Sequence, residues 1–202
     1  MERLGRAFYD RPTVEVAKGL LGKRLVRGLE GVELAGIVVE VEAYGGYDDP
    51  ASHAFRGMTP RNAVMFGDPG HSYVYFTYGN HYCLNVTTEP AGVAGAVLIR
   101  ALEPTEGIGL MKKYRGTKDI SQLTSGPGKL TRAMKVDLGL NGEDLVSSRR
   151  LYLTEGKTGR ISWDNTSRVG VSRGSERQWR FFVKGCGFVS KGRPSLALDT
   201  NP

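Results

Sequence analysis

The segment from residue 37 to residue 44 alternates between two kinds of side chain, and this alternation constrains the fold more than any other feature. The apolar positions are Ile37, Val39, Val41 and Ala43, and the alternate positions are Glu40, Glu42 and Tyr44. Successive side chains of a β-strand point to opposite faces of its sheet. The pattern therefore predicts a strand with one apolar face and one face that carries two carboxylates and a phenol ring.

Residues 72–78 and 81–88 are rich in aromatic and β-branched side chains and predict two further strands. Gly79 and Asn80 stand between them, and this pair tolerates the positive φ angles of a tight hairpin turn. The hairpin would place Tyr78 beside its tip. A large ring exposed to water is typical of a binding surface, and a flat ring can wedge between stacked bases.

The chain has 202 residues, with 28 Lys and Arg against 21 Asp and Glu, and its formal net charge is +7. This length suffices for one domain with its own core, and the basic excess favours polyanionic partners. The first residues lack the apolar stretch of a signal peptide, and the most apolar run is far shorter than the ~20 residues of a membrane span. We therefore expect a soluble, non-secreted protein without a membrane partner, in the cytoplasm with the bacterial nucleoid or, in a eukaryote, in the nucleus.

The cysteine pattern gives little support to metal or disulfide chemistry. The chain has two cysteines, Cys83 and Cys186, and neither belongs to a CxxC pair. His81 and Cys83 share one side of a predicted strand, but the further ligands of a closed zinc site are missing. We expect no metal, no cofactor and two reduced, buried thiols, with one disulfide as the alternative.

The remaining elements follow one another without a linker that would divide the chain. Helices are predicted for residues 12–21, for a short turn that Thr59 caps with Pro60 first, for the stretch after Pro104, and after residues 125–128. Further strands are predicted at residues 34–44, 94–102, 149–153, 168–171 and 179–183. The pattern indicates an α+β fold: a single mixed domain over residues 1–202 with a curved, largely antiparallel sheet, flanking helices and a protruding β-hairpin.

Several separated stretches keep an order and spacing that is found together in one family. They include Val39-Glu40-Val41-Glu42-Ala43-Tyr44, Ala51-Ser52-His53, Thr59-Pro60-Arg61-Asn62, Tyr73-Val74-Tyr75, Tyr78-Gly79, Asn85, Leu98-Ile99-Arg100-Ala101-Leu102-Glu103-Pro104, Ser125-Gly126-Pro127 and Arg168-Val169-Gly170. In these stretches the chain resembles the alkyladenine DNA glycosylase family, also called 3-methyladenine DNA glycosylase. The resemblance implies a monofunctional enzyme that flips alkylated or deaminated purines out of duplex DNA. It would then hydrolyse the N-glycosidic bond and leave an abasic site for base excision repair.

The same resemblance implies a role for individual residues. It assigns the general base to Glu42 and places Arg100 close to that carboxylate. It implies that Tyr78 fills the gap that the flipped base leaves in the stack. The residues that it places around the base are Tyr44, His53, Tyr75 and Asn85, the last of which would disfavour normal guanine.

Contacts with the DNA backbone are expected from basic residues at two predicted helix starts. Arg61 lies near one start, and Lys129 and Arg132 lie at the other. The expected partner is double-stranded DNA that contains damaged purines. No obligate protein partner is expected, because one hairpin can clamp a duplex as a monomer.

Other interpretations of the same residues stay open. Glu40 and Glu42 could be solvated residues of an amphipathic strand, or, at ~6.6 Å along it, the paired carboxylates of an inverting glycosidase. Tyr44 and Tyr75 could be sheet residues with hydroxyls at a wet edge. Arg100 could simply neutralise a buried glutamate. The alternative functions are a non-catalytic nucleic-acid-binding module and a hydrolase of free nucleosides.

Overall fold

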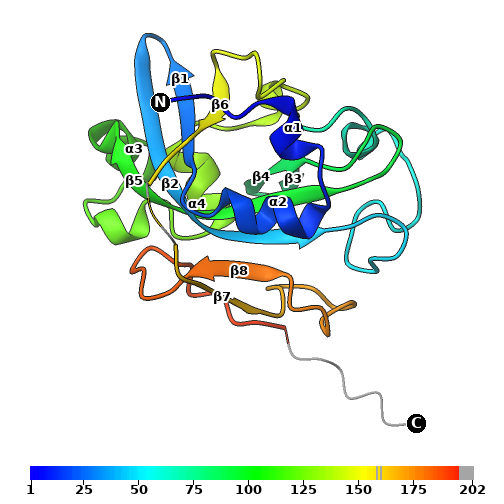
Figure 1. Cartoon of the computed structure of the whole chain (residues 1–202). Coiled ribbons are helices and arrows are strands. Elements are labelled where there is room, and N and C mark those ends of the chain that lie inside the picture. The colour runs from blue at the N-terminus through cyan, green and yellow to red at the C-terminus, as the bar shows by residue number, and fades with distance from the viewer. Residues whose placement is uncertain (158, 160, 196–202) are drawn as a thin grey trace.

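The computed structural model describes residues 1–157, 159 and 161–195, so the last seven residues of the expected domain lie outside the described part (Figure 1). Its sheet has the strand order β3-β4-β5-β2-β1-β6, and the β7–β8 pair joins it at β2. The strands are β1 Arg24–Leu29, β2 Val32–Tyr44, β3 Ser72–Thr77, β4 His81–Thr87, β5 Ala96–Glu106, β6 Leu151–Thr154, β7 Trp163–Thr166 and β8 Arg180–Val183. The helices are α1 Arg6–Tyr9, α2 Thr13–Leu20, α3 Ile108–Arg115 and α4 Pro127–Ala133, with short 3₁₀ turns at Ala63–Phe66, Ile120–Gln122 and Leu138–Leu140. Neighbouring strands are antiparallel, which confirms the expected α+β class.

Strand β2 crosses the middle of the sheet and has three partners. β5 follows it along one side. On the other side, β1 pairs with the first half of β2, and β8 pairs with residues 40–42 of β2. The C-terminal lobe, residues 163–195, is therefore attached to the strand that carries both glutamates and forms a separate layer below it in Figure 1.

A β-bulge interrupts β2 where β1 gives way to β8. The register with β5 shifts between Val38 and Val41. An inserted residue moves the following side chains to the other face of a strand. Val38 therefore shares the main core with Val41, whereas Val39 packs outside that core. The predicted alternation is correct from residue 40 onward and wrong before it.

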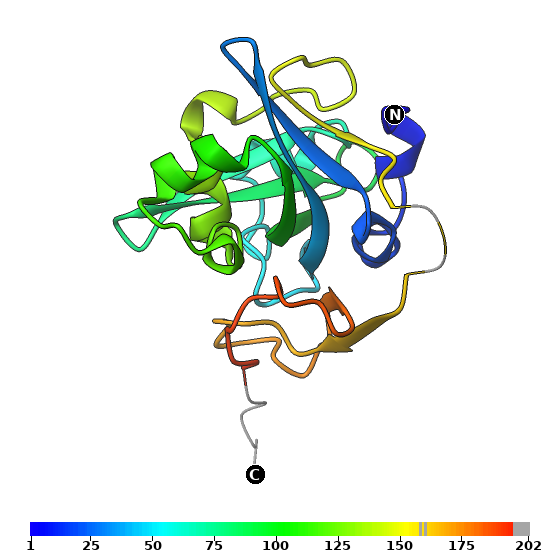
Figure 2. The ribbon, with the colours of Figure 1, turned by 90° about the vertical axis from the view of Figure 1, so that its left-hand side faces the viewer.

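One continuous apolar core lies beneath the strands that carry the site. Helix α2 packs against β2 and β5, and helix α4 packs against β4 and β5. Val16 and Leu20 of α2 and Leu130 of α4 are completely buried in this core, and Met111 of α3 joins them. Figure 2 shows α3 and α4 on the side of the sheet toward which the hairpin points. In the described ranges no helix has the length and apolar character that crossing a membrane requires.

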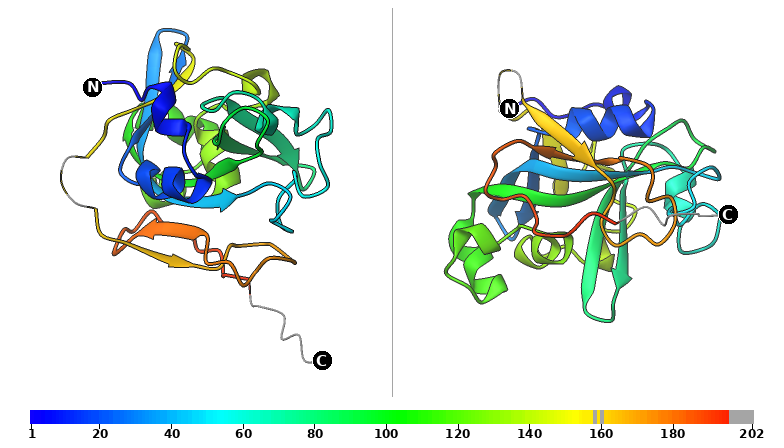
Figure 3. Two further views of the ribbon diagram at one scale, coloured as in Figure 1. Left: turned by 45° about the vertical axis from the view of Figure 1, so that its right-hand side comes forward. Right: turned by 90° about the horizontal axis from the view of Figure 1, so that it is seen from below.

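The hairpin of β3 and β4 protrudes from the molecule, as expected (Figure 3, right). Its loop has three residues, because Thr77 pairs with His81. The positive φ angles belong to Tyr78 (51°) and Gly79 (71°), so the turn is one residue earlier than the predicted Gly79-Asn80 pair. The Tyr78 side chain is 82 % exposed. A bulky residue in left-handed backbone conformation, with its ring in solvent, marks a strained tip.

Three local predictions were wrong or incomplete. Residues 168–171 form no strand, because the backbone N–H groups of Val169 and Val171 donate to side chains of Glu42 and Ser195 instead of to a neighbouring strand. The turn after Thr59 becomes a 3₁₀ helix only at residue 63. Strands β1 and β7 and helix α1 were not predicted. Both cysteines are free thiols, but Cys186 is only half-buried.

Candidate active site

A cavity of about 310 Å³ lies between the hairpin, the loop at residues 44–53 and the segment at residues 169–173. Small-molecule pockets typically enclose ~300–1,000 Å³. Six residues of the expected site line this cavity: Tyr44, His53, Tyr75, Tyr78, Asn85 and Arg100. They come from β2, β3, β4, β5, one loop and the hairpin tip, so the sheet brings together residues that are far apart in the sequence.

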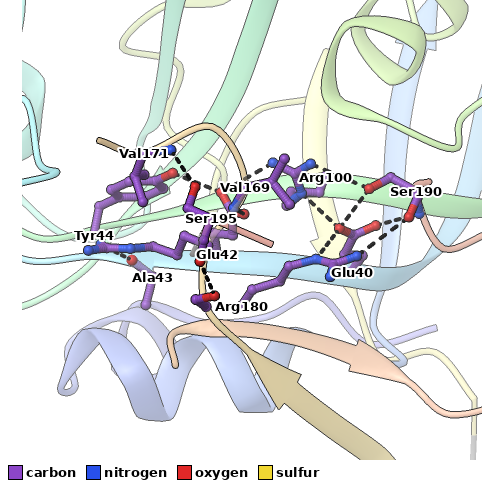
Figure 4. Close-up of polar contacts among 12 residues, drawn as sticks. Glu40, Glu42, Ala43, Tyr44, Arg100, Val169, Val171, Arg180, Ser190 and Ser195 are labelled. Carbon is purple, nitrogen blue, oxygen red and sulfur yellow. Dashed lines mark hydrogen bonds and ion pairs between the residues drawn. The ribbon is translucent and has the colours of Figure 1, made fainter. Parts of the chain in front are cut away.

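Glu42 is fully buried directly behind the cavity wall. Its Oε1 accepts a hydrogen bond from the backbone N–H of Val169 at 2.7 Å, and its Oε2 accepts one from the Tyr44 hydroxyl at 2.8 Å. Arg100 Nη1 lies 3.2 Å from Oε2. All three partners line the cavity, and Figure 4 shows them converging on the carboxylate. These contacts fix the orientation of the Glu42 carboxylate, which is separated from the cavity by the groups that bind it.

A second carboxylate lies two residues earlier on the same strand. Glu40 is also fully buried and accepts a hydrogen bond from Arg100 Nε at 2.8 Å. Burial alone would raise the pKa of Glu40, but Arg100, Arg180 and the Ser190 N–H lower it below its ordinary value. Burial alone would lower the pKa of Arg100, but Glu42 and Glu40 raise it. Neither Glu40 nor Glu42 lines the cavity itself. All three partners of Glu42 line it, whereas Arg100 alone does so among the described partners of Glu40, and the geometry therefore favours Glu42 over a pair of carboxylates.

Three aromatic rings form one wall of the cavity. His53 Nδ1 lies 2.8 Å from the Tyr73 hydroxyl, and the rings of His53 and Tyr75 stack edge to face at 4.6 Å. Burial, assisted by Arg61, lowers the pKa of His53. Burial raises the pKa of Tyr73 to about 12 and raises that of Tyr75 as well. The wall is therefore uncharged near neutral pH.

A buried arginine, Arg168, supports the part of the cavity wall that Tyr44 forms. Arg168 is fully buried and forms a two-pronged ion pair with Asp49 at 2.6 and 2.8 Å. Its guanidinium lies 4.8 Å from the centre of the Tyr44 ring and donates to the Ala43 carbonyl at 3.0 Å. Burial and Glu42 raise the pKa of Tyr44. The phenol therefore keeps its proton and donates a hydrogen bond to Glu42.

Asn85 forms part of the floor on β4. It is buried, and its side-chain amide nitrogen donates to the Tyr73 carbonyl at 2.9 Å across the hairpin. Cys83, two residues earlier, lines the cavity too, and burial raises the pKa of its thiol. Both side chains reach the cavity because residues two apart on a strand share a face.

Sequence reasoning missed several residues that shape this site. Asp49, Tyr73 and the backbone N–H of Val169 all contribute, and only Tyr73 had a local signal, since it alternates with Tyr75. The other two lie in irregular loops. Arg168 belongs to a stretch that the resemblance matched, but its partner could not be identified before the loops were placed.

Comparison with known proteins assigns the chain to a family. The family model described as Methylpurine-DNA glycosylase (MPG) matches residues 7–187. The chain belongs to the methylpurine-DNA glycosylase family. A protein of Carboxydothermus hydrogenoformans is 50 % identical over 93 % of this chain and 98 % of its own length. One of Prosthecochloris aestuarii is 52 % identical over 96 % and 94 %, and one of Chlorobium phaeovibrioides is 47 % identical over 96 % and 100 %. All three carry names that assign them provisionally as 3-methyladenine DNA glycosylases.

Membership of this family makes the chain a DNA glycosylase, a hydrolase of DNA repair. The family resemblance that the sequence motifs indicated is therefore confirmed. In this glycosylase the predicted backbone contacts lie outside the cavity. Arg61 is exposed, stacks over Tyr75 at 5.4 Å and donates to the Phe76 carbonyl at 3.3 Å. Lys129 donates to Gln122 at 2.6 Å and Arg132 donates to the Tyr114 carbonyl at 2.9 Å. Across the described residues, no three His, Cys, Asp or Glu side chains are grouped to hold a metal ion.

Proposed function

We propose that this glycosylase flips an alkylated purine out of duplex DNA into the 310 Å³ cavity and hydrolyses its N-glycosidic bond there, leaving an abasic site. The proposal includes deaminated purines, which share the size of the natural bases. The observation that carries it is the carboxylate of Glu42, held by Tyr44, Arg100 and the Val169 N–H behind a cavity with aromatic walls. The enzyme would act wherever the chromosome lies, which in a bacterium is the nucleoid.

Glu42 is the proposed general base. Cleavage of the bond develops positive charge on the sugar, and a nearby carboxylate stabilises that charge while it activates water. General-base assistance contributes roughly 10²- to 10⁴-fold in rate. Arg100 and the Val169 N–H hold Glu42 in a fixed orientation, so little reorganisation is needed when the bond breaks. No lysine is needed as a nucleophile, and strand cleavage is not expected.

The uncharged wall of His53, Tyr73 and Tyr75 suits a damaged purine that carries positive charge, and the charge of Arg100, which also lines the cavity, is offset by Glu42. The electron-rich rings of Tyr44 and Tyr75 attract such a cation. The lowered pKa of His53 keeps its ring neutral, which avoids repulsion between His53 and the base. Asn85 would occupy space that the exocyclic amine of normal guanine needs. Selectivity thus comes from charge and from shape.

Flipping costs a few kcal/mol of stacking and pairing, and the cost is smallest where damage has weakened the pair. Tyr78 would offset part of it by stacking in the vacated space, since its ring is already in solvent. Arg61, Lys129 and Arg132 are proposed to contact phosphates beside the lesion. Each phosphate contact would replace one modest hydrogen bond that the side chain makes within the free protein.

The test is release of free base from defined duplexes that contain 3-methyladenine, 7-methylguanine, hypoxanthine or 1,N6-ethenoadenine. The proposal predicts release from at least one alkylated duplex and alkali-labile abasic sites in it, with no strand break before alkali. Tight nucleic-acid binding without release from any duplex would favour a non-catalytic module. Release from mononucleosides alone would favour a nucleoside hydrolase.

A further inference from the structure

Glu40 accepts four hydrogen bonds from three separate segments of the chain. Its Oε1 accepts from Arg100 Nε at 2.8 Å, from Arg180 Nε at 2.7 Å and from the Ser190 hydroxyl at 2.8 Å. Its Oε2 accepts from the Ser190 N–H at 2.6 Å. These partners come from β5, from β8 and from the segment after β8. One fully buried carboxylate therefore joins the main sheet to the C-terminal lobe.

The contact with Arg100 determines how that arginine meets Glu42. A guanidinium is planar, so a hydrogen bond that fixes Nε also fixes the direction of Nη1. Arg100 donates from Nε to Glu40 and presents Nη1 to Glu42 at 3.2 Å (Figure 4). Gly192 leaves room for this pose, since a Cβ there would lie 3.3 Å from Arg100 Nη2 and 2.9 Å from the Val169 side chain.

The contacts of Glu40 with the C-terminal lobe also bear on a second partner of Glu42, the N–H of Val169. Arg180 also donates from Nη1 to the Thr166 hydroxyl at 3.2 Å, which joins β8 to the end of β7. Val169 follows three residues later and donates its N–H to Glu42. The segment that carries this N–H is thus anchored to Glu40 through Arg180. Two of the three groups that hold Glu42 are thus linked to Glu40, Arg100 directly and the Val169 N–H through Arg180, and the Arg168–Asp49 ion pair holds the latter segment as well.

We propose that Glu40 is a positioning residue for excision: it orients Arg100 and anchors the C-terminal lobe, and so holds Glu42 in its reactive pose without touching the substrate. The inference rests on the proposed function of Glu42. Charge balance supports it, because two buried carboxylates, Glu40 and Glu42, face two buried arginines, Arg100 and Arg180. Buried charges are stable only in such paired arrangements.

The test uses Glu40→Gln, which keeps the shape of the side chain and removes its charge. Single-turnover excision, corrected for the folded fraction, is expected to fall about 10- to 100-fold, as small misplacements in active sites do. The dissociation constant of lesion DNA is expected to change less than about threefold, because Glu40 does not line the cavity. Glu40→Asp, which keeps the charge, is expected to recover part of the rate.

Two further measurements separate positioning from simple loss of stability. Glu143→Gln removes another carboxylate with an arginine partner, one that is half-buried and does not line the cavity, and is expected to lower stability without slowing excision. The Arg100 Nε–H signal in NMR spectra is expected to be protected from exchange in the native protein, because it is buried and donates to Glu40, and to lose this protection in Glu40→Gln. This NMR measurement does not depend on catalytic activity. It therefore tests whether Glu40 positions Arg100 even if the protein excises no lesion.

A Glu40→Gln protein with the native rate per folded molecule and an unchanged Arg100 signal would overturn the inference. If Glu40→Gln does not fold, Ser190→Ala replaces it, since this change removes one hydroxyl contact to Glu40 and one to Arg100 at 3.4 Å. Ser190→Ala is then expected to slow excision severalfold, and a native rate would contradict the inference. Absence of excision by the native protein would instead contradict the proposed function.

Discussion

Replacing Tyr78 with glycine should move stability and DNA binding in opposite directions. Tyr78 has a φ of 51°, a conformation that costs a non-glycine residue about 1–2 kcal/mol. Glycine removes this strain but adds about 0.4–1 kcal/mol of entropy to the unfolded chain. The ring is 82 % exposed, so few contacts are lost. The free energy of unfolding of Tyr78→Gly should therefore stay equal or rise by up to about 1.5 kcal/mol, as measured by urea denaturation.

The same change should weaken binding to lesion DNA. A fully buried aromatic side chain removes ~150–250 Å² from water, so the exposed 82 % of Tyr78 sets an upper limit of about 3–5 kcal/mol at ~25 cal/mol per Å². Stacking on a base is typically worth ~1–3 kcal/mol. The dissociation constant should therefore rise roughly 5- to 150-fold. Ethenoadenine fluorescence in a duplex reports both binding and flipping, and a Glu42→Gln background prevents turnover.

Tyr78→Phe is the matched control, because it keeps the ring and the backbone strain and should bind as the native protein does. The reasoning would be refuted if Tyr78→Gly bound and flipped the lesion normally. It would also be refuted if the glycine variant lost more than about 1 kcal/mol of stability, since the tip would then carry contacts that the strain argument leaves out.

Further predictions concern the residues in and around the site. Arg168→Met leaves the buried Asp49 without its charged partner and should lower the free energy of unfolding by about 3–5 kcal/mol, measured by urea denaturation. Arg168 lowers the pKa of Asp49 below the ordinary 3.8, although burial alone would raise it, so this stabilisation is present above that pH and is lost as the pH falls through the folded value. In Asp49→Asn, the free energy of unfolding should therefore fall less steeply than in the native protein as the pH is lowered into the acid range. Asn85→Ala should increase release of unmodified guanine, measured on undamaged duplexes, and an unchanged release would exclude Asn85 from discrimination. Lys129→Ala combined with Arg132→Ala should reduce the slope of log affinity against log salt by about 1.8, at ~0.9 per phosphate, and an unchanged slope would show that neither residue contacts the backbone.

Much of the sheet could be predicted because its signal is local. Alternation from residue 40 to residue 44 placed Glu42 and Tyr44 on one face, and the structure joins them by a hydrogen bond. Residues 72–88 predicted the hairpin, and the turn signal of Gly79 and Asn80 placed Tyr78 beside its tip. The turn was assigned one residue late, because glycine and asparagine are the usual residues at positive φ, and here a tyrosine adopts that conformation.

The remaining features depend on contacts between distant segments. The bulge after Val38 lies where β8 replaces β1 beside β2, and no local pattern records this exchange of partners. Arg168 lies 119 residues from Asp49, and its stretch resembles a strand although its neighbours donate to side chains. The four contacts of Glu40 come from residues 60, 140 and 150 positions away. Contacts of this kind can be identified only in the folded structure, where the C-terminal lobe packs against β2.

The most direct test of the account compares the native protein with Glu42→Gln in single-turnover release of 3-methyladenine from a duplex. Glu33→Gln, at the exposed end of the same strand, is the control and should release base normally. The account predicts that Glu42→Gln loses at least about 10²-fold in rate while its dissociation constant for the lesion duplex stays within a few-fold of native. Native release by Glu42→Gln would show that this carboxylate is not the general base.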